Sequence, residues 1–187
     1  MLIKNAMIHV GNGEILKDHD ILIEDGIIKK VGKNIDKKDA KIIDASGKEV
    51  FPGFIEPMTS MGCVDFSSSF SDHEERSNPI TPEMNIKYAF NPEEMELQTL
   101  YKRGVTSVGA TPGNSDGIDG QMAVFKTQGG SASKMLVKEC VGLKCSVVGN
   151  IVETYGEKGM FPQTKMGIFN ALKRILREAQ EYMDKGE

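Results

Sequence analysis

Alternating apolar and polar residues dominate the first fifty positions and predict β-structure. Leu2 to Val10 is a β-rich run, and two further runs at 21–24 and 27–31 flank an Asp-Gly pair. Asp-Gly between such runs is typical of a tight hairpin turn. Strands are also predicted at 40–44 and 49–55. We therefore expect a small antiparallel module of β-sandwich type.

A polar stretch from Ser67 to Glu83 separates these strands from a pattern of helix and strand. A long stretch of this kind in a compact fold is a functional or a mobile surface loop. Asn91 as N-cap and Gly104 as terminator predict a helix between them, and the β-branched run 105–110 predicts a strand directly after it. A helix followed so closely by a strand is typical of a parallel sheet or barrel.

The second half of the chain adds two predicted strands and a long helix. The strands are predicted at 122–126 and 143–148, and an amphipathic helix at 164–185, with Gly186 suited to its end. Apolar residues recur along this helix at the spacing of a stripe that faces a core. The stripe consists of Ile168, Phe169, Leu172, Ile175, Leu176, Ala179, Tyr182 and Met183.

Composition narrows the range of partners. The net charge of −4 has both signs interspersed, so neither nucleic acid nor a membrane surface is an expected partner. No apolar run approaches the roughly 18 residues that span a bilayer, and no long apolar signal core opens the chain, so we predict a cytoplasmic protein. Cys63, Cys140 and Cys145 are odd in number and include no Cys-x-x-Cys pair. They therefore suggest neither a disulfide framework nor a zinc knuckle.

The segment Pro52–Gly62 resembles a metal-binding strand from which the ligands are missing. It is similar to the Pro-Gly-Phe-Ile-Asp-x-His-x-His segment of the amidohydrolase superfamily, in which two histidines hold a catalytic divalent metal, zinc or another. Here Met58 and Ser60 occupy the two histidine positions, and Glu56 and Pro57 also depart from the pattern. A thioether and a neutral hydroxyl are poor replacements for imidazole on zinc. We predict no cofactor and no metal ligands for this chain.

Other segments extend the resemblance over nearly the whole chain. The strands at 24–32, 43–48 and 52–55 resemble the entry into such enzymes, and later segments are similar to the imidazolonepropionase-like branch. These segments are 79–82, 90–92, 104–108, 112–113, 120–121, Lys126, 142–144, Asn150, 155–156 and 164–167.

The resemblance implies an α/β fold of two domains. Residues 1–50 are interpreted as part of a β-sandwich-type module, and residues 51–187 as the first part of a metal-dependent-hydrolase (β/α) TIM-like barrel. A barrel of this type typically needs about 250 residues. The chain is therefore expected to supply only the opening of a barrel.

Four residues that match the branch are candidates for substrate binding. Asp72 and Glu75 match acidic positions of the branch, although the charged run around His73 is also typical of a solvated loop. Gln121 and Lys126 match branch residues on a predicted loop near the ligand, where binding and loop packing are both open.

Lys144 is the fifth candidate. Some superfamily members carbamylate a barrel-strand lysine to bridge two metals, while a structural or solvent-facing role is the alternative here. The following stretch departs from the branch at Gly149, where a glutamate is usual, and retains Asn150. No Ser/His/Asp or Cys/His constellation emerges, so the catalytic residues stay unknown.

By resemblance, the predicted function is hydrolysis of non-peptide C–N bonds, of the cyclic-amide type, with a small-molecule substrate. We expect the isolated chain to be inactive, as a truncated or degenerate form. Two alternatives remain open: one half of a split enzyme completed by a C-terminal half-barrel chain, or a non-catalytic binding module, for which a homo-oligomer is an open alternative.

Overall fold

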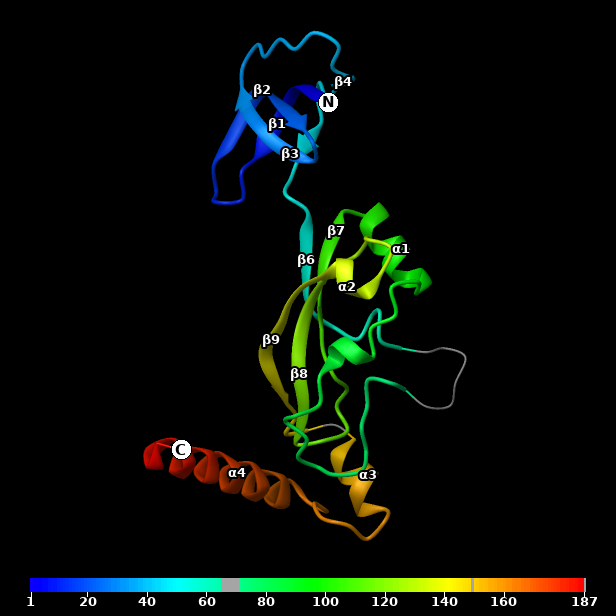
Figure 1. Ribbon diagram of the computed structural model, residues 1–187, viewed down its shortest axis with the longest axis vertical. Helices are drawn as coiled ribbons and strands as arrows, with labels where there is room; N and C mark the ends of the chain where they lie inside the picture. Colours follow the sequence, from blue (N-terminus) through cyan, green and yellow to red (C-terminus); the bar gives the residue numbers. More distant parts are fainter. Residues whose placement is uncertain (65–70, 149, 187) are drawn as a thin grey trace. The chain divides into compact units, whose positions relative to one another are not determined.

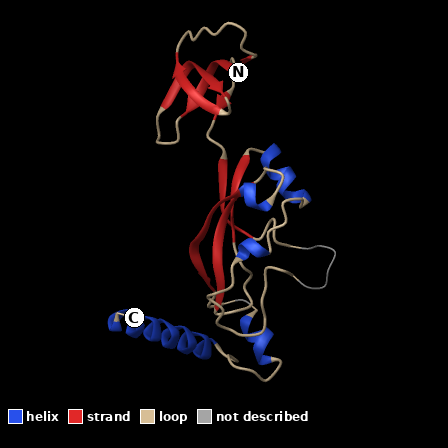
Figure 2. Cartoon of the chain, viewed as in Figure 1, coloured by secondary structure: helices blue, strands red, loops and turns tan. Residues whose placement is uncertain are grey.

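The computed structural model describes residues 1–64, 71–148 and 150–186 (Figures 1 and 2). The first part of the predicted polar loop, residues 67–70, and Gly149 lie outside these residues. The chain divides into two compact units, Met1–Phe54 and Ile55–Glu187.

The first unit is a five-stranded mixed sheet, not the antiparallel module that the sequence predicts. The strand order is β3-β2-β1-β4, and β5 also pairs with β1. The pairs β1–β2 and β2–β3 are antiparallel, whereas β4 and β5 both run parallel to β1. Hydrophobic alternation specifies a strand but not the direction of its neighbour, which explains the error. The strands are β1 (Leu2–His9), β2 (Ile15–Glu24), β3 (Ile27–Gly32), β4 (Ile42–Asp44) and β5 (Glu49–Val50).

The predicted hairpin turn is confirmed. Asp25 and Gly26 have φ of 51° and 73°, and they join β2 to the antiparallel β3. Two successive positive φ values match the right-handed twist of the flanking strands.

Asp20 is buried inside this unit, where its carboxylate accepts hydrogen bonds from the backbone N–H groups of Asn5 and Ile35 at 3.0 and 2.9 Å.

The second unit contains a four-stranded sheet of order β6-β7-β8-β9 with helices beside it (Figure 1). Its strands are β6 (Phe54–Thr59), β7 (Val105–Ala110), β8 (Ile118–Lys126) and β9 (Leu136–Cys145). Its helices are the 3₁₀ turn η1 (Ile86–Tyr88), α1 (Met95–Lys102), α2 (Ala132–Met135), α3 (Ile151–Gly156) and α4 (Lys165–Lys185).

The direction of the later strands differs from the predicted parallel arrangement. Both β7–β8 and β8–β9 are antiparallel pairs. Only residues 111–117 join β7 to β8, and 127–135 join β8 to β9. Parallel neighbours need a crossover of a dozen or more residues, so these short connections favour antiparallel pairs. The opening of a parallel barrel remains a prediction.

The core of the second unit lies between α1 and the sheet. The rings of Phe90 and Phe125 stack with centroids 3.7 Å apart, and Leu97 of α1 is fully buried beside them. α1 begins later than predicted, because the Asn91 side chain accepts the Glu93 N–H at 3.0 Å and forms a turn. Gly104, with φ of 89°, follows the helix as predicted.

The bounds of α4 agree with the predicted helix. The Thr164 hydroxyl caps its start by accepting the Gly167 N–H at 3.2 Å, and Gly186 ends it with a φ of 70°. The predicted core-facing stripe is covered only in the first turns, where Ile168 packs against Ile151 and Tyr155 of α3. Among the described helices, none is long and apolar enough to cross a membrane.

Gly109 allows β6 to lie against β7. A Cβ at this position would stand 2.2 Å from the backbone oxygen of Pro57, which cannot move without shifting the strand. We predict that G109A lowers the free energy of unfolding by roughly 1–3 kcal/mol, as overpacking does. Urea unfolding followed by circular dichroism measures the loss. The matched control is G156A in α3, where a Cβ makes only ordinary contacts from 3.6 Å. Equal stability of both variants would contradict the prediction.

Candidate functional site

The strand that resembles a metal site does not present a zinc ligand set. Met58 lies on β6 and is 57% exposed, and Ser60 follows the strand and is half-buried. Alternate residues of a strand share a face, so imidazoles at these two positions could meet one ion. A thioether and a hydroxyl do not replace them. In the described part of the chain, no three His, Cys, Asp or Glu side chains gather as a metal site. The residues present do not fit the metal of the family.

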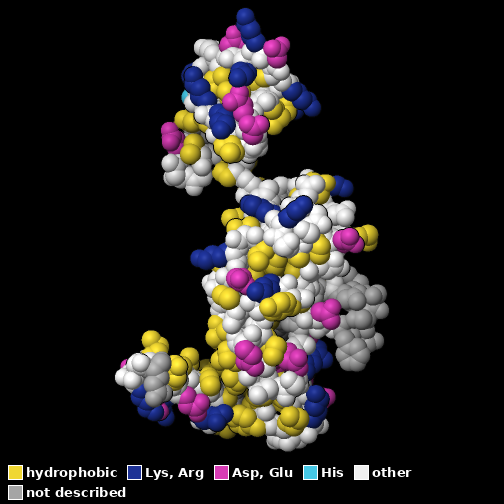
Figure 3. Space-filling model, in the orientation of Figure 1, with side chains coloured by type: hydrophobic (Ala, Val, Ile, Leu, Met, Phe, Trp, Pro, Cys, Tyr) yellow, Lys and Arg dark blue, Asp and Glu magenta, His cyan; other side chains and the backbone are white. Residues whose placement is uncertain are grey.

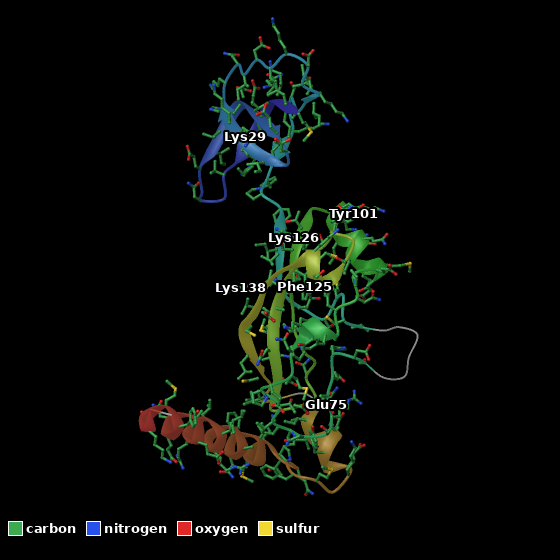
Figure 4. The ribbon with its side chains drawn as sticks, viewed as in Figure 1. Lys29, Glu75, Tyr101, Phe125, Lys126 and Lys138 are labelled. Atoms are coloured by element: carbon green, nitrogen blue, oxygen red, sulfur yellow. The ribbon has the colours of Figure 1, made fainter. Side chains whose placement is uncertain are left out.

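A cavity of about 490 Å³ lies elsewhere in the second unit. Four carboxylates line it, Asp72, Glu74, Glu75 and Asp119, together with His73 and residues from η1 and its flanks. None of the described lining residues is lysine or arginine. The cavity therefore combines the size of a small-molecule site with an acidic wall. Glu75 of this group is labelled in Figure 4.

The acidic loop is held against the segment that follows β7. Gly113 donates its N–H to the carbonyl of His73 at 2.9 Å, and a Cβ on Gly113 would stand 2.2 Å from Glu74 Cγ. The Arg76 guanidinium forms an ion pair with Glu74. Burial disfavours the charged form of Glu74 and by itself raises its pKa. The hydrogen bond and positive charge of Arg76, with smaller contributions from Ser115 and His73, outweigh this effect, so that the pKa of Glu74 lies below its usual value. Glu74 thus remains ionised at the cavity wall.

Glu75 is engaged by its own loop. One carboxylate oxygen accepts the N–H groups of Arg76 and Ser77 at 2.9 and 3.0 Å. Hydrogen bonds from Ser77 and from the Arg76 backbone lower the pKa of Glu75. Asp72 is exposed at the same cavity. The structure therefore brings Asp72 and Glu75 together, although their binding role stays a prediction.

A network of buried polar groups lies behind Asp119. Asp116 is 1% exposed and accepts hydrogen bonds from the Tyr155 hydroxyl and, at 3.3 Å, from the Thr81 hydroxyl. Asp119 accepts the Asp116 N–H at 2.9 Å and the Ser146 hydroxyl at 2.7 Å. Burial raises the pKa of Asp116 to about 6, and it also raises the pKa of Asp119. Sequence reasoning missed both aspartates, although they stand in a glycine-rich turn directly before a predicted strand.

The other three candidates do not line the cavity. Gln121 accepts hydrogen bonds from Asn85 at 3.1 Å and from Cys140 at 2.9 Å, and donates to the Pro82 carbonyl at 3.0 Å. These contacts tie η1 to the sheet, which favours loop packing over binding. Lys126, at the end of β8, donates to the Ser107 hydroxyl at 3.2 Å (Figure 4).

Lys144 has a structural set of contacts. Its ammonium group donates to the Gly113 carbonyl at 2.9 Å and to the Asn114 side-chain oxygen at 2.6 Å. Both acceptors belong to the turn between β7 and β8. These contacts support a structural role for Lys144, because its ammonium group already donates two hydrogen bonds to the turn beside Asp119.

The comparisons with known proteins agree with the resemblance seen in the sequence. An amidohydrolase from Thermotoga maritima of known structure is 32% identical and superposes with a TM-score of 0.88 over 99% of this chain and 49% of its own. The 5-methylthioadenosine/S-adenosylhomocysteine deaminase of Pyrococcus furiosus is 47% identical over 64 residues, 34% of this chain and 15% of its own. These relatives support assignment to the amidohydrolase superfamily.

A further relative shows how much of each protein is shared. The dihydroorotase of Caldanaerobacter subterraneus subsp. tengcongensis is 49% identical over 61 residues, 33% of this chain and 14% of its own. The chain thus spans about half of the Thermotoga structure and about one seventh of the curated relatives. No protein-family model matches the sequence.

The raised pKa of Asp116 predicts a pH dependence of stability. The folded state binds the Asp116 proton more tightly than the unfolded chain does, so protonation of Asp116 stabilises the fold. This contribution to the free energy of unfolding is fully present below about pH 4 and is lost as the pH rises through about 6. We predict that D116N lacks this loss, which amounts to up to roughly 3 kcal/mol for a shift of this size. Urea unfolding from pH 4 to 7 measures both proteins.

The matched control for this experiment is D72N, because Asp72 is exposed. Asp119 and Glu75 also raise the Asp116 pKa by charge repulsion, and both remain in each variant. D72N should keep the pH slope of the wild-type protein. A D116N variant with the wild-type slope would show that Asp116 titrates normally.

Proposed function

We propose that this chain forms part of an amidohydrolase-type hydrolase of non-peptide C–N bonds and does not hydrolyse them by itself. The observation that carries the proposal is the donor set of β6. The strand has the outline of the family's metal-binding strand, but Met58 and Ser60 offer a thioether and a hydroxyl in place of imidazole. The branch similar to imidazolonepropionase is the favoured subgroup, supported by segments such as Phe90-Asn91-Pro92.

The contribution of this chain to such an enzyme would be substrate binding. The acidic cavity has about 490 Å³, within the usual range for small-molecule sites. Asp72 and the ionised Glu74 face it, and the network around Asp119 fixes one wall. In this proposal these groups hold polar or cationic parts of a small molecule and orient it.

The groups that perform hydrolysis would come from outside the residues of this chain. A metal of the family supplies an activated water when it is bound. The Thermotoga amidohydrolase has about as much chain again beyond the matched part. An equivalent half, in a longer polypeptide or in a partner chain, is the proposed source of ligands and of the catalytic acid and base.

A non-catalytic binding module is the second candidate. It is favoured by the cavity, which is lined by described residues of the second unit alone. Binding of a small molecule would then need no metal and no further chain. The two candidates differ in whether an added half creates turnover.

We predict that the purified chain, supplied with zinc, shows no turnover of cyclic amides. The reason is the missing imidazole pair. Metal analysis of the protein combined with a hydrolysis screen of cyclic amides checks this. A stoichiometric zinc ion held by the chain together with turnover would end the proposal. Binding of a cyclic amide without turnover, detected by calorimetry, would support it.

Restoring the two histidines should create zinc affinity. We predict that M58H/S60H binds zinc at least tenfold more tightly than the wild-type chain, because alternate strand positions share a face. Competition with a zinc-chelating dye measures the affinity. The matched control is M58A/S60A, which removes both side chains and adds no donor. If M58H/S60H and the control bind alike, β6 does not present these positions as the family strand does.

A further inference from the structure

The charged side chains that line the acidic cavity are of one sign. They are the carboxylates of Asp72, Glu74, Glu75 and Asp119, and no lysine or arginine is among the described lining residues. On the face of the chain shown in Figure 3, by contrast, acidic and basic side chains are interspersed. The cavity therefore differs from the surface seen in that view in the sign of its charge.

Two cations lie close to this lining without cancelling its charge. Arg76 forms an ion pair with Glu74, and Lys144 donates to the turn beside Asp119. Four carboxylates and two cations leave a balance of −2, with His73 counted as neutral. Burial raises the pKa of Asp119, and with that group protonated the balance is still −1. The cavity therefore attracts a cation and repels an anion.

The carboxylates are spread along the cavity and do not converge on one point. In the part of the chain that the structure describes, no three His, Cys, Asp or Glu side chains gather closely enough to hold a metal ion. Calcium takes about six to eight oxygen ligands at roughly 2.3–2.6 Å. The spacing of the carboxylates therefore disfavours a bare metal ion and suits a cation whose charge is carried by a larger organic body.

Much of the remaining cavity wall is apolar. Met84, Ile86 and Ala89 line it from η1 and its flanks, and Pro112 lines it from the segment after β7. Such walls hold the carbon skeleton of a ligand, while a few polar groups fix its orientation. With about 490 Å³, the cavity has room for a small ring that carries a charged substituent.

Asp72 and Glu75 are the carboxylates most accessible to a ligand. Both side chains are exposed and line the cavity. Glu74 is already paired with Arg76, and Asp119 is only 5% exposed and accepts hydrogen bonds within its own network. A charged group that enters the cavity therefore meets Asp72 and Glu75 first.

We propose that the small molecule bound at this cavity is an organic cation. Its protonated amine is directed at Asp72 and Glu75, and its ring lies against the apolar wall at Met84 and Ala89. The inference rests on the proposed function, which supplies the cyclic amide as the ring. It excludes substrates that carry a carboxylate or a phosphate, because the same lining repels them. Asp72 and Glu75 thereby determine the charge of the substrate.

The test compares four probes that differ in one group. Three are pyrrolidinones with an aminomethyl, a methyl or a carboxylate substituent on the same ring carbon. The fourth is cyclopentylmethylamine, which keeps the amine and lacks the amide. Chemical-shift titration of the whole chain at neutral pH and low salt measures each dissociation constant. The aminomethyl lactam should bind at least tenfold more tightly than the carboxylate lactam, with the methyl lactam between them, because the lining attracts one charge and repels the other.

Variants that remove charge test the two carboxylates. D72N/E75Q keeps the size of both side chains and should reduce the ratio of the two affinities to less than about threefold. Its affinity for the methyl lactam should stay unchanged, which shows that the cavity is still formed. The matched control is E181Q/D184N, which changes the net charge equally at exposed positions of α4 outside the described lining. This control should keep the wild-type ratio.

The outcomes distinguish this inference from the proposed function. If the carboxylate or the methyl lactam binds as tightly as the aminomethyl lactam, or if D72N/E75Q keeps the wild-type ratio, the cavity does not select cations, although a preference for cyclic amides would stand. If cyclopentylmethylamine binds as tightly as the aminomethyl lactam, cation selection holds and the cyclic-amide part of the proposed function is wrong. Calcium that displaces the amine where potassium of equal ionic strength does not would overturn the inference in favour of a metal site. Failure of all four probes to bind would also overturn it.

Discussion

The hydrogen bonds of the buried Asp116 carboxylate are the interaction on which the arrangement of the second unit depends. It joins Tyr155 of α3 and Thr81 of the segment before η1, which are distant in sequence. Its own N–H is bound by Asp119, which also holds Ser146 after β9. Removing a carboxylate from water is costly unless donors replace the water, and two hydroxyl groups do so here. The turn before β8 is thereby fixed between the cavity and α3.

This arrangement explains why the cavity wall and the helices are linked. Asp119 faces the cavity, while Tyr155 belongs to the apolar cluster in which α3 contacts the first turns of α4. The same short turn therefore supports a polar surface on one side and an apolar contact on the other. A small molecule at the cavity would meet a wall that is already hydrogen-bonded, so that little reorganisation accompanies binding.

Local features of the fold followed from the sequence, and features that depend on distant residues did not. The hairpin turn at Asp25-Gly26 and the ends of α4 at Thr164 and Gly186 are set by the conformational preferences of those residues. Strand direction depends on the length of connections and on the partner strand. For this reason the sequence predicts β4, β5 and β8 as strands, but it predicts the wrong direction for them relative to the strands they pair with.

The candidate site likewise combines local features, which the sequence predicts, with contacts between distant residues, which it does not. Asp72 and Glu75 lie at one cavity because they share a loop, whereas the contacts of Gln121 and Lys144 come from other elements. Asp116 and Asp119 carry no local signal of burial, since an aspartate in a glycine-rich turn is usually exposed. Only the approach of Thr81, Ser146 and Tyr155 reveals their role.

The strand β6 shows that likeness to a family and the activity of that family depend on different residues. The outline of a strand depends on backbone pairing and on positions such as Gly109, which tolerate no side chain against Pro57. Metal chemistry depends on two side chains that the backbone does not require. With Met58 and Ser60 at the two positions that resemble the family's histidines, the strand is intact but offers zinc no imidazole donor. A fold can keep its architecture after the chemistry has moved elsewhere or has been lost, because the site occupies few of its residues.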